Sequence, residues 1–409
     1  MHLRERAVVA SLRVFGGPLA TISPTAHTRS GKYFDYVLRG DSSDPESALG
    51  AVREFEKQTG RVPAGVVPFI DAGLMPGWAI ANHFGLPYLA YSAAHDSSIN
   101  KHLMKDRLLA AGVPTPRYIQ VGSADDALAA ARQLGLPCVI KPSAFGGSLG
   151  VRLIATPEQA AEAYEYAAKI IADNAATFTV VNRAIQVEEY CDLADEVSVE
   201  VLSHHGEHAA LAVVDKSLGP RPFFAEMGHR VPSRYSGRDD IKDLALRACA
   251  AIGLDHGLAH VEVRCEGARQ PQVIEVGART AGGGIIDLLE RALGIAPYEL
   301  HVRSYLDRLD SLPRPQASGV AAIAILKAPP GRIVGILPPA RVPGAVVSYE
   351  VFATAGTVSQ PPANYLNREG YVECFWPGAR PETVPPAAHL EIAGELARQI
   401  FRVEDPAAG

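Results

Sequence analysis

The sequence predicts a mixed α/β (α+β) protein with several domains, and three observations support this prediction. The chain has 409 residues, of which 47% are hydrophobic and 21% are charged, and this composition provides enough apolar surface for two or three cores. Stretches typical of strands alternate with stretches typical of helices over most of the chain. After about residue 312 the sequence becomes rich in Val, Gly and Pro, which is typical of a small antiparallel sheet.

Composition also excludes several classes of protein. The net charge is -6 and no basic block is present, so we expect no nucleic-acid partner. The sequence has no run of about 18 apolar residues, so we expect no membrane span. The first residues lack the apolar core of a signal peptide. The cysteines are scattered without metal-site spacing, at 138, 191, 249, 265 and 374. They predict reduced thiols and a cytoplasmic location.

Residues 1–99 are expected to form an N-terminal α/β unit. Its predicted strands cover 8–13, 34–38, 64–70 and 86–92, and its predicted helices cover 43–60 and 76–85. Pro45 near the start of the first helix and Gly60 at its end are typical of helix boundaries. This alternation predicts a parallel sheet.

Three further units are expected, covering residues 100–187, 188–312 and 313–409. Helices are predicted at 100–112, 123–135, 241–253, 282–294, 297–307 and 389–401, with another that begins near residue 156. Strands are predicted at 137–143, 150–156, 184–190, 196–203, 259–265 and 271–277, and in four runs after residue 318. The strands at 259–265 and 271–277 are predicted to pair as a hairpin.

The stretch IKPSAFGGSLGV, residues 140–151, places a lysine directly before a glycine-rich loop. A buried ammonium without a partner costs several kcal/mol, so Lys141 must reach solvent or an anion. Glycines allow backbone N–H groups to approach a ligand and allow a loop to move. The loop is therefore a candidate lid over phosphates. The order of lysine and glycines differs from that of a P-loop, and a lysine that merely reaches the surface is the alternative.

The predicted hairpin carries two glutamates. If its turn is centred between residues 268 and 269, Glu262 and Glu275 are cross-strand partners, and like charges in that arrangement are destabilising without a cation. Two such carboxylates suit Mg²⁺, which prefers oxygen ligands and shares substrate phosphates. Arg279 follows and could neutralise a phosphoryl group in transfer. The alternatives are a solvated hairpin face and a structural pair between Arg279 and a glutamate.

In this order, the motifs resemble the ATP-grasp superfamily of carboxylate–amine ligases, over roughly residues 64 to 305. The matching features are Lys101 on a helix before Gly-Val-Pro-Thr-Pro, Ile-Lys-Pro with its glycine loop, Val-Glu-Glu-Tyr (187–190), His-Val-Glu-Val (260–263) and Ile-Glu-Val-Gly-Ala-Arg (274–279). Glu226-Met-Gly-His229, followed by Pro232, further resembles the L-amino-acid ligases, which join two amino acids into a dipeptide.

The resemblance implies an ATP-grasp fold with an N-terminal Rossmann-like domain (1–99), a small lid domain (100–187) and a large catalytic domain (188–312). A C-terminal β-rich subdomain (313–409) would follow, and with the catalytic domain it would form the antiparallel-sheet part of the fold. The cofactors implied are ATP and Mg²⁺ or Mn²⁺, and the partners are amino acids. Enzymes of this kind are commonly homodimers, but no residue here decides the oligomeric state.

The resemblance also implies individual roles. Lys101 and Lys141 would hold the ATP phosphates beneath Gly146, Gly147 and Ser148. The adenosine would lie near Glu188, Glu189, Tyr190, Cys191, Leu193 and Glu196, with Glu196 at the ribose. Glu262 and Glu275 would bind the metal. Four residues would be catalytic. Arg279 would meet the acyl phosphate, Lys141 would hold phosphate, and Glu226 and His229 would contact the amino-acid substrate.

Two positions depart from the family pattern. Gly277 stands where many members have Asn, and Gly283 stands where amino-acid ligases can carry a bulky side chain, which predicts a roomier pocket. The expected reaction forms an amide bond between amino acids through an acyl phosphate and releases ADP and phosphate. The alternatives are ligation to a larger natural-product acid or peptide, carboxylation with bicarbonate, and a nucleotide-binding module without turnover.

Overall fold

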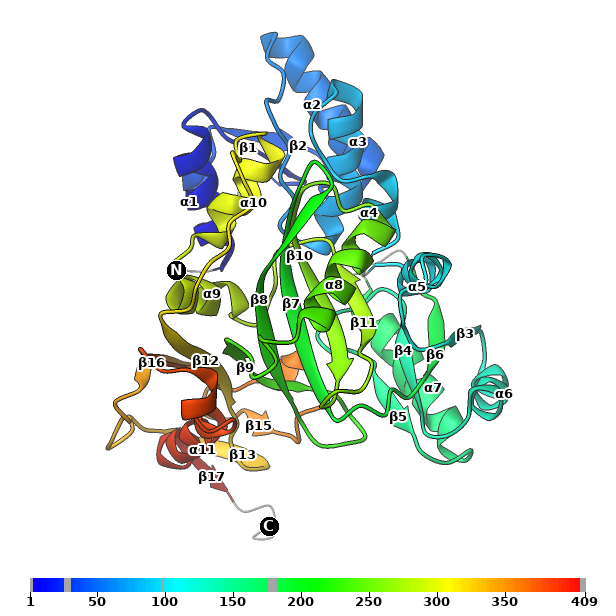
Figure 1. Ribbon diagram of the computed structural model, residues 1–409, viewed down its shortest axis with the longest axis vertical. Coiled ribbons are helices and arrows are strands. Elements are labelled where there is room, and N and C mark those ends of the chain that lie inside the picture. Colours follow the sequence, from blue (N-terminus) through cyan, green and yellow to red (C-terminus); the bar gives the residue numbers. More distant parts are fainter. Residues whose placement is uncertain (1–2, 26–30, 98, 176–181, 405–409) are drawn as a thin grey trace.

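The computed structural model describes residues 3–25, 31–97, 99–175 and 182–404 and is organised around one large antiparallel sheet (Figure 1). Its strand order is β11-β10-β7-β8-β9-β12-β16-β14. In chain order these strands are β7 (Asp195–His204), β8 (Glu207–Leu218), β9 (Glu226–Val231), β10 (Gly257–Cys265), β11 (Gln272–Gly277), β12 (Gly319–Leu326), β14 (Val346–Val351) and β16 (Gly370–Pro377).

Alternation along the central strands separates a helix-covered face from a polar one. On β7, Val197, Val199 and Val201 join a core with helices α5 (Lys101–Ala110) and α8 (Asp239–Ile252). The residues that alternate with them, Glu196, Ser198 and Glu200, point to the other face because side chains alternate along a strand. The sheet thus presents a row of carboxylates toward the small sheet of the molecule.

The small sheet has the order β3-β6-β4-β5 and is antiparallel throughout. Its strands are β3 (Tyr118–Val121), β4 (Cys138–Pro142), β5 (Arg152–Ile154) and β6 (Ile185–Glu189). Helices α6 (Ala124–Leu134) and α7 (Gln159–Asn174) share its core. Ser123 caps α6 by accepting a hydrogen bond from the Asp126 N–H, so the predicted helix 123–135 is confirmed.

The N-terminal region holds the largest corrections. The predicted strand 8–13 is wrong, because these residues belong to helix α1 (Leu3–Phe15), where Ala7, Ala10 and Val14 are buried at helical spacing. The predicted strands 64–70 and 86–92 are also wrong, since neither run pairs with another strand. Apolar runs of this length can be buried without a ladder, and periodicity alone does not separate the cases.

The other elements of this region include a two-stranded parallel sheet rather than a larger one. It pairs β1 (Ala20–Ser23) with β2 (Tyr36–Arg39). The helices are α2 (Pro45–Thr59), α3 (Leu74–Phe84) and α4 (Tyr91–His95), with short 3-10 turns at Gly31–Tyr33 and Asp71–Gly73. The predicted helices 43–60 and 76–85 are confirmed.

The residues after 312 join the central sheet. Strands β12, β16 and β14 continue it beyond β9, so the boundary expected at residue 313 falls inside one continuous sheet. Strands β13 (Gly331–Ile336), β15 (Val358–Ser359) and β17 (Phe401–Glu404) form a separate sheet next to α11 (Ala388–Ile400), and 3-10 turns occur at Tyr365–Asn367 and Pro381–Thr383. The domain boundaries themselves stay predictions.

Two more helices complete the fold, α9 (Ile285–Leu293) and α10 (Pro297–Tyr305). They pack with α1 beside β12 and the upper part of β7 and β8 (Figure 1). Among the described residues, no helix is both long enough and apolar enough to cross a lipid bilayer.

Candidate active site

A cavity of about 910 Å³ lies between the small sheet, the glycine loop and the polar face of the central sheet. Fifteen of the sixteen predicted site residues line it. They are Lys101, Lys141, Gly146, Gly147, Ser148, Glu188, Glu189, Tyr190, Cys191, Glu196, Glu226, His229, Glu262, Glu275 and Arg279. Leu193 is buried outside the lining, where its carbonyl accepts a hydrogen bond from Arg264. The fold therefore brings the predicted set into one cleft.

The two glutamates of the hairpin face each other. Glu262 and Glu275 are partners in the β10–β11 ladder, so the predicted register is confirmed. Burial raises the pKa of Glu275, and the nearby charge of Glu262 raises it further. Burial also opposes the charge of Glu262, but Lys216 and His260 hold its pKa well below the usual range. One carboxylate is thus neutralised by protein cations, while the other is only partly neutralised.

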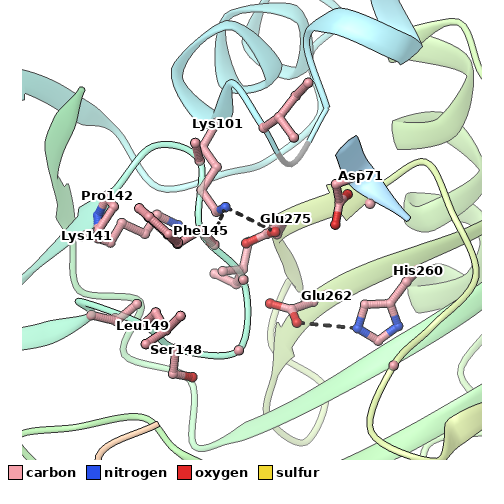
Figure 2. Close-up of a pocket in the computed structure, with 18 of the residues that line it drawn as sticks. Asp71, Lys101, Lys141, Pro142, Phe145, Ser148, Leu149, His260, Glu262 and Glu275 are labelled. Atoms are coloured by element: carbon pink, nitrogen blue, oxygen red, sulfur yellow. Dashed lines mark hydrogen bonds and ion pairs between the residues drawn. The ribbon is translucent and has the colours of Figure 1, made fainter. Parts of the chain in front are cut away.

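The two predicted phosphate lysines lie at the cavity wall, where Figure 2 shows Lys101 in contact with Glu275. The Lys101 ammonium donates a hydrogen bond to the Phe145 carbonyl at 2.8 Å and lies 3.3 Å from Glu275. The Lys141 ammonium lies 2.7 Å from Glu188. Both lysines are buried, so the alternative that Lys141 simply reaches the surface is wrong.

Sequence reasoning missed the role of Lys105. It lies one helical turn after Lys101 on α5, is fully buried, and places its ammonium 3.2 Å from the second oxygen of Glu188. Burial lowers the pKa of Lys105 to about 8, although Glu188 opposes this. The four-residue spacing to Lys101 was the available signal, since residues at that spacing share one helix face.

The glycine loop between β4 and β5 is held over the cavity by two distant segments. Gly147 has φ of +63°, and a Cβ there would lie 2.3 Å from the ring of Tyr365. The Tyr365 N–H also donates to the Gly147 carbonyl at 3.2 Å. The Ser148 hydroxyl donates to the Phe224 carbonyl at 2.7 Å. Neither Tyr365 nor Phe224 was expected, because no local pattern links them to the loop.

Lys216 forms a second charged cluster at the centre of the polar face. Its ammonium lies 2.9 Å from Glu196 and 3.0 Å from Glu226, and it donates a hydrogen bond to Glu262. Burial opposes the charge of Lys216, but these carboxylates raise its pKa well above the usual range. No strand was predicted around Lys216, and the available signal was a lysine shortly after the apolar run 209–214 in a chain with only nine lysines.

Glu226 and His229 lie together on β9. Arg368 approaches the Glu226 carboxylate at 3.3 Å, and the His229 Nε2 atom is 3.9 Å away from that carboxylate. Burial lowers the pKa of His229 to about 3, so its imidazole is neutral. Burial opposes the charge of Glu226, yet Lys216 lowers the pKa of that carboxyl to about 2. A Cβ at Gly283 would lie 2.7 Å from His229 Nε2. The space predicted at Gly283 for a substrate is therefore taken by the imidazole.

Arg279 is paired with the N-terminal region and not with a hairpin glutamate. Its Nε atom donates to Asp71 at 3.0 Å, which corrects the alternative of a structural pair with Glu262 or Glu275. A Cβ at Gly277 would lie 3.4 Å from the Arg279 guanidinium. The arginine therefore occupies the direction that a side chain at residue 277 would take.

The chain is similar to known proteins in both sequence and structure. The ATP-grasp domain family matches residues 134–287. Alanine–anticapsin ligase of Bacillus subtilis (strain 168) is 28% identical over 216 residues, which cover 49% of this chain and 45% of that protein. An uncharacterised protein of Sinorhizobium fredii, y4rH, is 25% identical over 348 residues, which cover 83% of this chain and 69% of that one.

A solved structure matches nearly the whole chain. The crystal structure of L-amino acid ligase from Bacillus licheniformis superposes with a TM-score of 0.74 at 20% identity, and covers 97% of this chain and 95% of that one. The protein therefore has the ATP-grasp fold, carries an ATP-grasp domain, and is related to L-amino acid ligases. The chain spans about half the length of alanine–anticapsin ligase.

Proposed function

We propose that this protein is an ATP-dependent ligase that joins two amino acids through an acyl phosphate and releases ADP and phosphate. One observation carries the proposal. The paired carboxylates of Glu262 and Glu275 share a cavity with Lys101, Lys141 and a glycine loop. The relationship to alanine–anticapsin ligase and to an L-amino acid ligase structure supports the same reaction class.

The donor set fits Mg²⁺ or Mn²⁺. Glu262 and Glu275 offer carboxylate oxygens only, which are the ligands that these hard ions prefer. Burial and the adjacent charge of Glu262 raise the pKa of Glu275, and a bound dication would favour the ionised form of both carboxyls. A bound divalent ion would polarise phosphoryl oxygens and neutralise their charge.

The small sheet is proposed to hold ATP. Lys101 and Lys141 would pair with its phosphates, since both ammonium groups already contact anionic or carbonyl oxygens at the cavity wall. The β6 end, Glu188 to Cys191 with Leu193 behind it, would face the adenine, and Glu196 would accept the ribose hydroxyls. The loop closed by Tyr365 and Phe224 would exclude water, because acyl phosphates hydrolyse.

The amino-acid side of the cavity is proposed to lie between Arg279 and β9. A carboxylate is a poor electrophile, so phosphorylation provides the leaving group, and Arg279 would stabilise the charge that develops during transfer. Glu226 is ionised and would attract an ammonium group. The attacking amine must lose a proton, and Glu226 and His229 are the two candidates to accept it.

The substrate pocket is proposed to be open at Gly282. A Cβ at Gly282 would meet no atom within 4 Å, whereas at Gly283 it would meet His229. A first amino acid with a bulky side chain is thus favoured.

A cytoplasmic location belongs to the same proposal, because all five cysteines are free and would stay reduced there.

The direct test is incubation of the protein with ATP, Mg²⁺ and mixed amino acids, followed by mass spectrometry of the products. We expect dipeptide masses and one ADP for each peptide bond. Stimulation of ADP release by bicarbonate alone would instead indicate a carboxylase. Release only with a larger acid or peptide would indicate the natural-product alternative, and no release under any condition would favour the nucleotide-binding module.

Glu275→Gln tests the metal assignment. The substitution removes one charge from the proposed metal pair, so we expect substrate-dependent ADP release to fall by at least about 10²-fold. Glu266→Gln is the matched control on the same hairpin. The Glu266 side chain is 41% exposed, and among the described residues its one ion pair is with Arg269. Equal rates for the two variants would contradict the assignment.

A further inference from the structure

Two consecutive histidines and an aspartate meet at the end of the central sheet away from the cavity. His204 ends β7, His205 lies in the turn to β8, and Asp307 follows α10. The His205 Nε2 atom is 2.6 Å from an Asp307 carboxylate oxygen, and the His204 Nε2 atom is 3.4 Å from the same oxygen. His204 lies four positions after Glu200 on β7, which corresponds to about 13 Å.

The backbone holds two of these residues in a conformation that suits glycine better. His205 has φ of 51° and Asp307 has φ of 55°, and among the described residues only Ser148 is another non-glycine residue with positive φ. Glycine would adopt these angles without a steric penalty. The turn and the helix end thus carry an imidazole and a carboxylate at positions where a residue without a side chain would fit more easily.

A third imidazole lies against this pair. The His256 ring centroid is 4.9 Å from that of His205 and 5.5 Å from that of His204. The His256 Nδ1 atom donates to the Ser304 carbonyl at 3.0 Å, which leaves the lone pair on Nε2. A hydrogen bond of this kind fixes the tautomer and orientation of a metal-binding histidine in known sites.

We propose that His204, His205 and Asp307 form a binding site for a transition-metal dication such as Zn²⁺, with the adjacent His256 as a fourth ligand. The ligand atoms of His204, His205 and Asp307 all lie within 4.8 Å of one another. Tetrahedral coordination places donor atoms about 3.3 Å apart, so modest side-chain rotation suffices. Two imidazoles with one carboxylate favour Zn²⁺, Co²⁺ or Ni²⁺ over Mg²⁺.

The bound ion would tie the β7–β8 turn to the end of α10. In the structure these two segments are joined by the hydrogen bond between His205 and Asp307, and the ion would replace the proton that this bond shares. The site stands apart from the proposed catalytic centre, since it uses residues of the opposite end of β7. It is therefore a structural clip that does not depend on the ligase proposal.

Metal titration of the full-length protein tests the site. The protein is first treated with a chelator and then titrated with Zn²⁺ in excess Mg²⁺, which occupies sites built from carboxylates alone. Co²⁺ serves as a second probe because its visible absorption reports imidazole coordination. We expect one Zn²⁺ per chain, a Tm that rises with Zn²⁺, and absorption bands typical of nitrogen ligands.

The variants are chosen to keep the backbone conformation. His205→Asn and Asp307→Asn retain residues that tolerate positive φ, and each should weaken Zn²⁺ binding by at least about tenfold. His83→Asn is the matched control, because His83 is exposed and lies outside the cluster. Glu275→Gln should bind Zn²⁺ as the wild type does. Failure of the wild type to bind, or equal binding by His205→Asn, would overturn the proposal.

Discussion

The ionisable side chains gathered near the two ends of strand β7 lie in opposite surroundings. At the inner end Glu196 and Glu200 are enclosed with Lys216, His260 and Glu262. At the outer end the side chains of His205 and Asp307 are 58% and 55% exposed. Water screens the outer pair, so its contact contributes little by itself. The inner charges are shielded from water and depend on one another, so removing one leaves its partners less compensated.

Lys216→Met should produce the largest effect. The substitution leaves Glu196, Glu226 and Glu262 without their shared cation, and breaking a buried ion pair in this way costs about 3–5 kcal/mol. Urea unfolding measures the loss. Mg²⁺ should restore part of the stability, because a dication can neutralise the same carboxylates.

The outer end supplies the contrast to this variant. Asp307→Asn, measured in chelator, should change the free energy of unfolding by less than about 0.5 kcal/mol, since it alters an exposed pair. If Lys216→Met and Asp307→Asn had equal effects, the difference between the two ends would not hold.

The pH dependence of stability should reveal His260 next. Burial alone would lower the pKa of His260, but Glu200 and Glu262 raise it to about 9. An unfolded histidine has a pKa near 6.5. Protonated His260 therefore stabilises the fold fully below about pH 6.5, and this contribution is lost as the pH rises through about 9. The loss amounts to about 3 kcal/mol.

Urea unfolding at several pH values, in buffer without divalent cations, checks this prediction. His260→Gln should lose most of the fall in stability between pH 6.5 and 9.5. His83→Gln should keep the wild-type profile, because His83 is exposed. A wild-type profile in His260→Gln would show that its imidazole is not charged in the folded protein.

Gly147→Ala should have a smaller effect on stability, because it changes only the glycine loop over the cavity. An alanine there would have φ of +63° and a Cβ 2.3 Å from the Tyr365 ring, so we expect the loop to open and nucleotide affinity to fall about tenfold, with little change in Tm. Gly146→Ala is the control, since a Cβ at Gly146 meets no atom within 4 Å. Tyr365→Ala should restore part of the affinity in Gly147→Ala. Equal affinity in both alanine variants would contradict this account of the loop.

Prediction from sequence succeeded where a few neighbouring residues decide the structure. The register that pairs Glu262 with Glu275 followed from the turn between β10 and β11, because turn position and side-chain alternation fix the register of a hairpin. The cap of α6 followed from Ser123 for the same kind of reason. The motif order also placed Lys101, Lys141 and the glycine loop correctly at one cavity.

Prediction failed where no local signal distinguishes a buried strand from a buried helix or an unpaired buried segment. The run at 8–13 is apolar enough for a strand, but it lies in α1, whose Arg6 contacts Asp287 and Glu290. The run at 64–70 was expected to pair in a sheet and instead remains unpaired. In both cases tertiary packing outweighed the local pattern.

By itself the sequence determined the hairpin, the glycine loop and the chemical types of the site residues, since these depend on short-range spacing and side-chain chemistry. Only the tertiary structure decided which charges meet. Asp71 contacts Arg279 across 208 positions of the chain, and Lys216 gathers carboxylates from three strands. The physical reason is that a buried charge pairs with a group on an element that packs against it. Which elements pack together depends on the arrangement of the whole sheet.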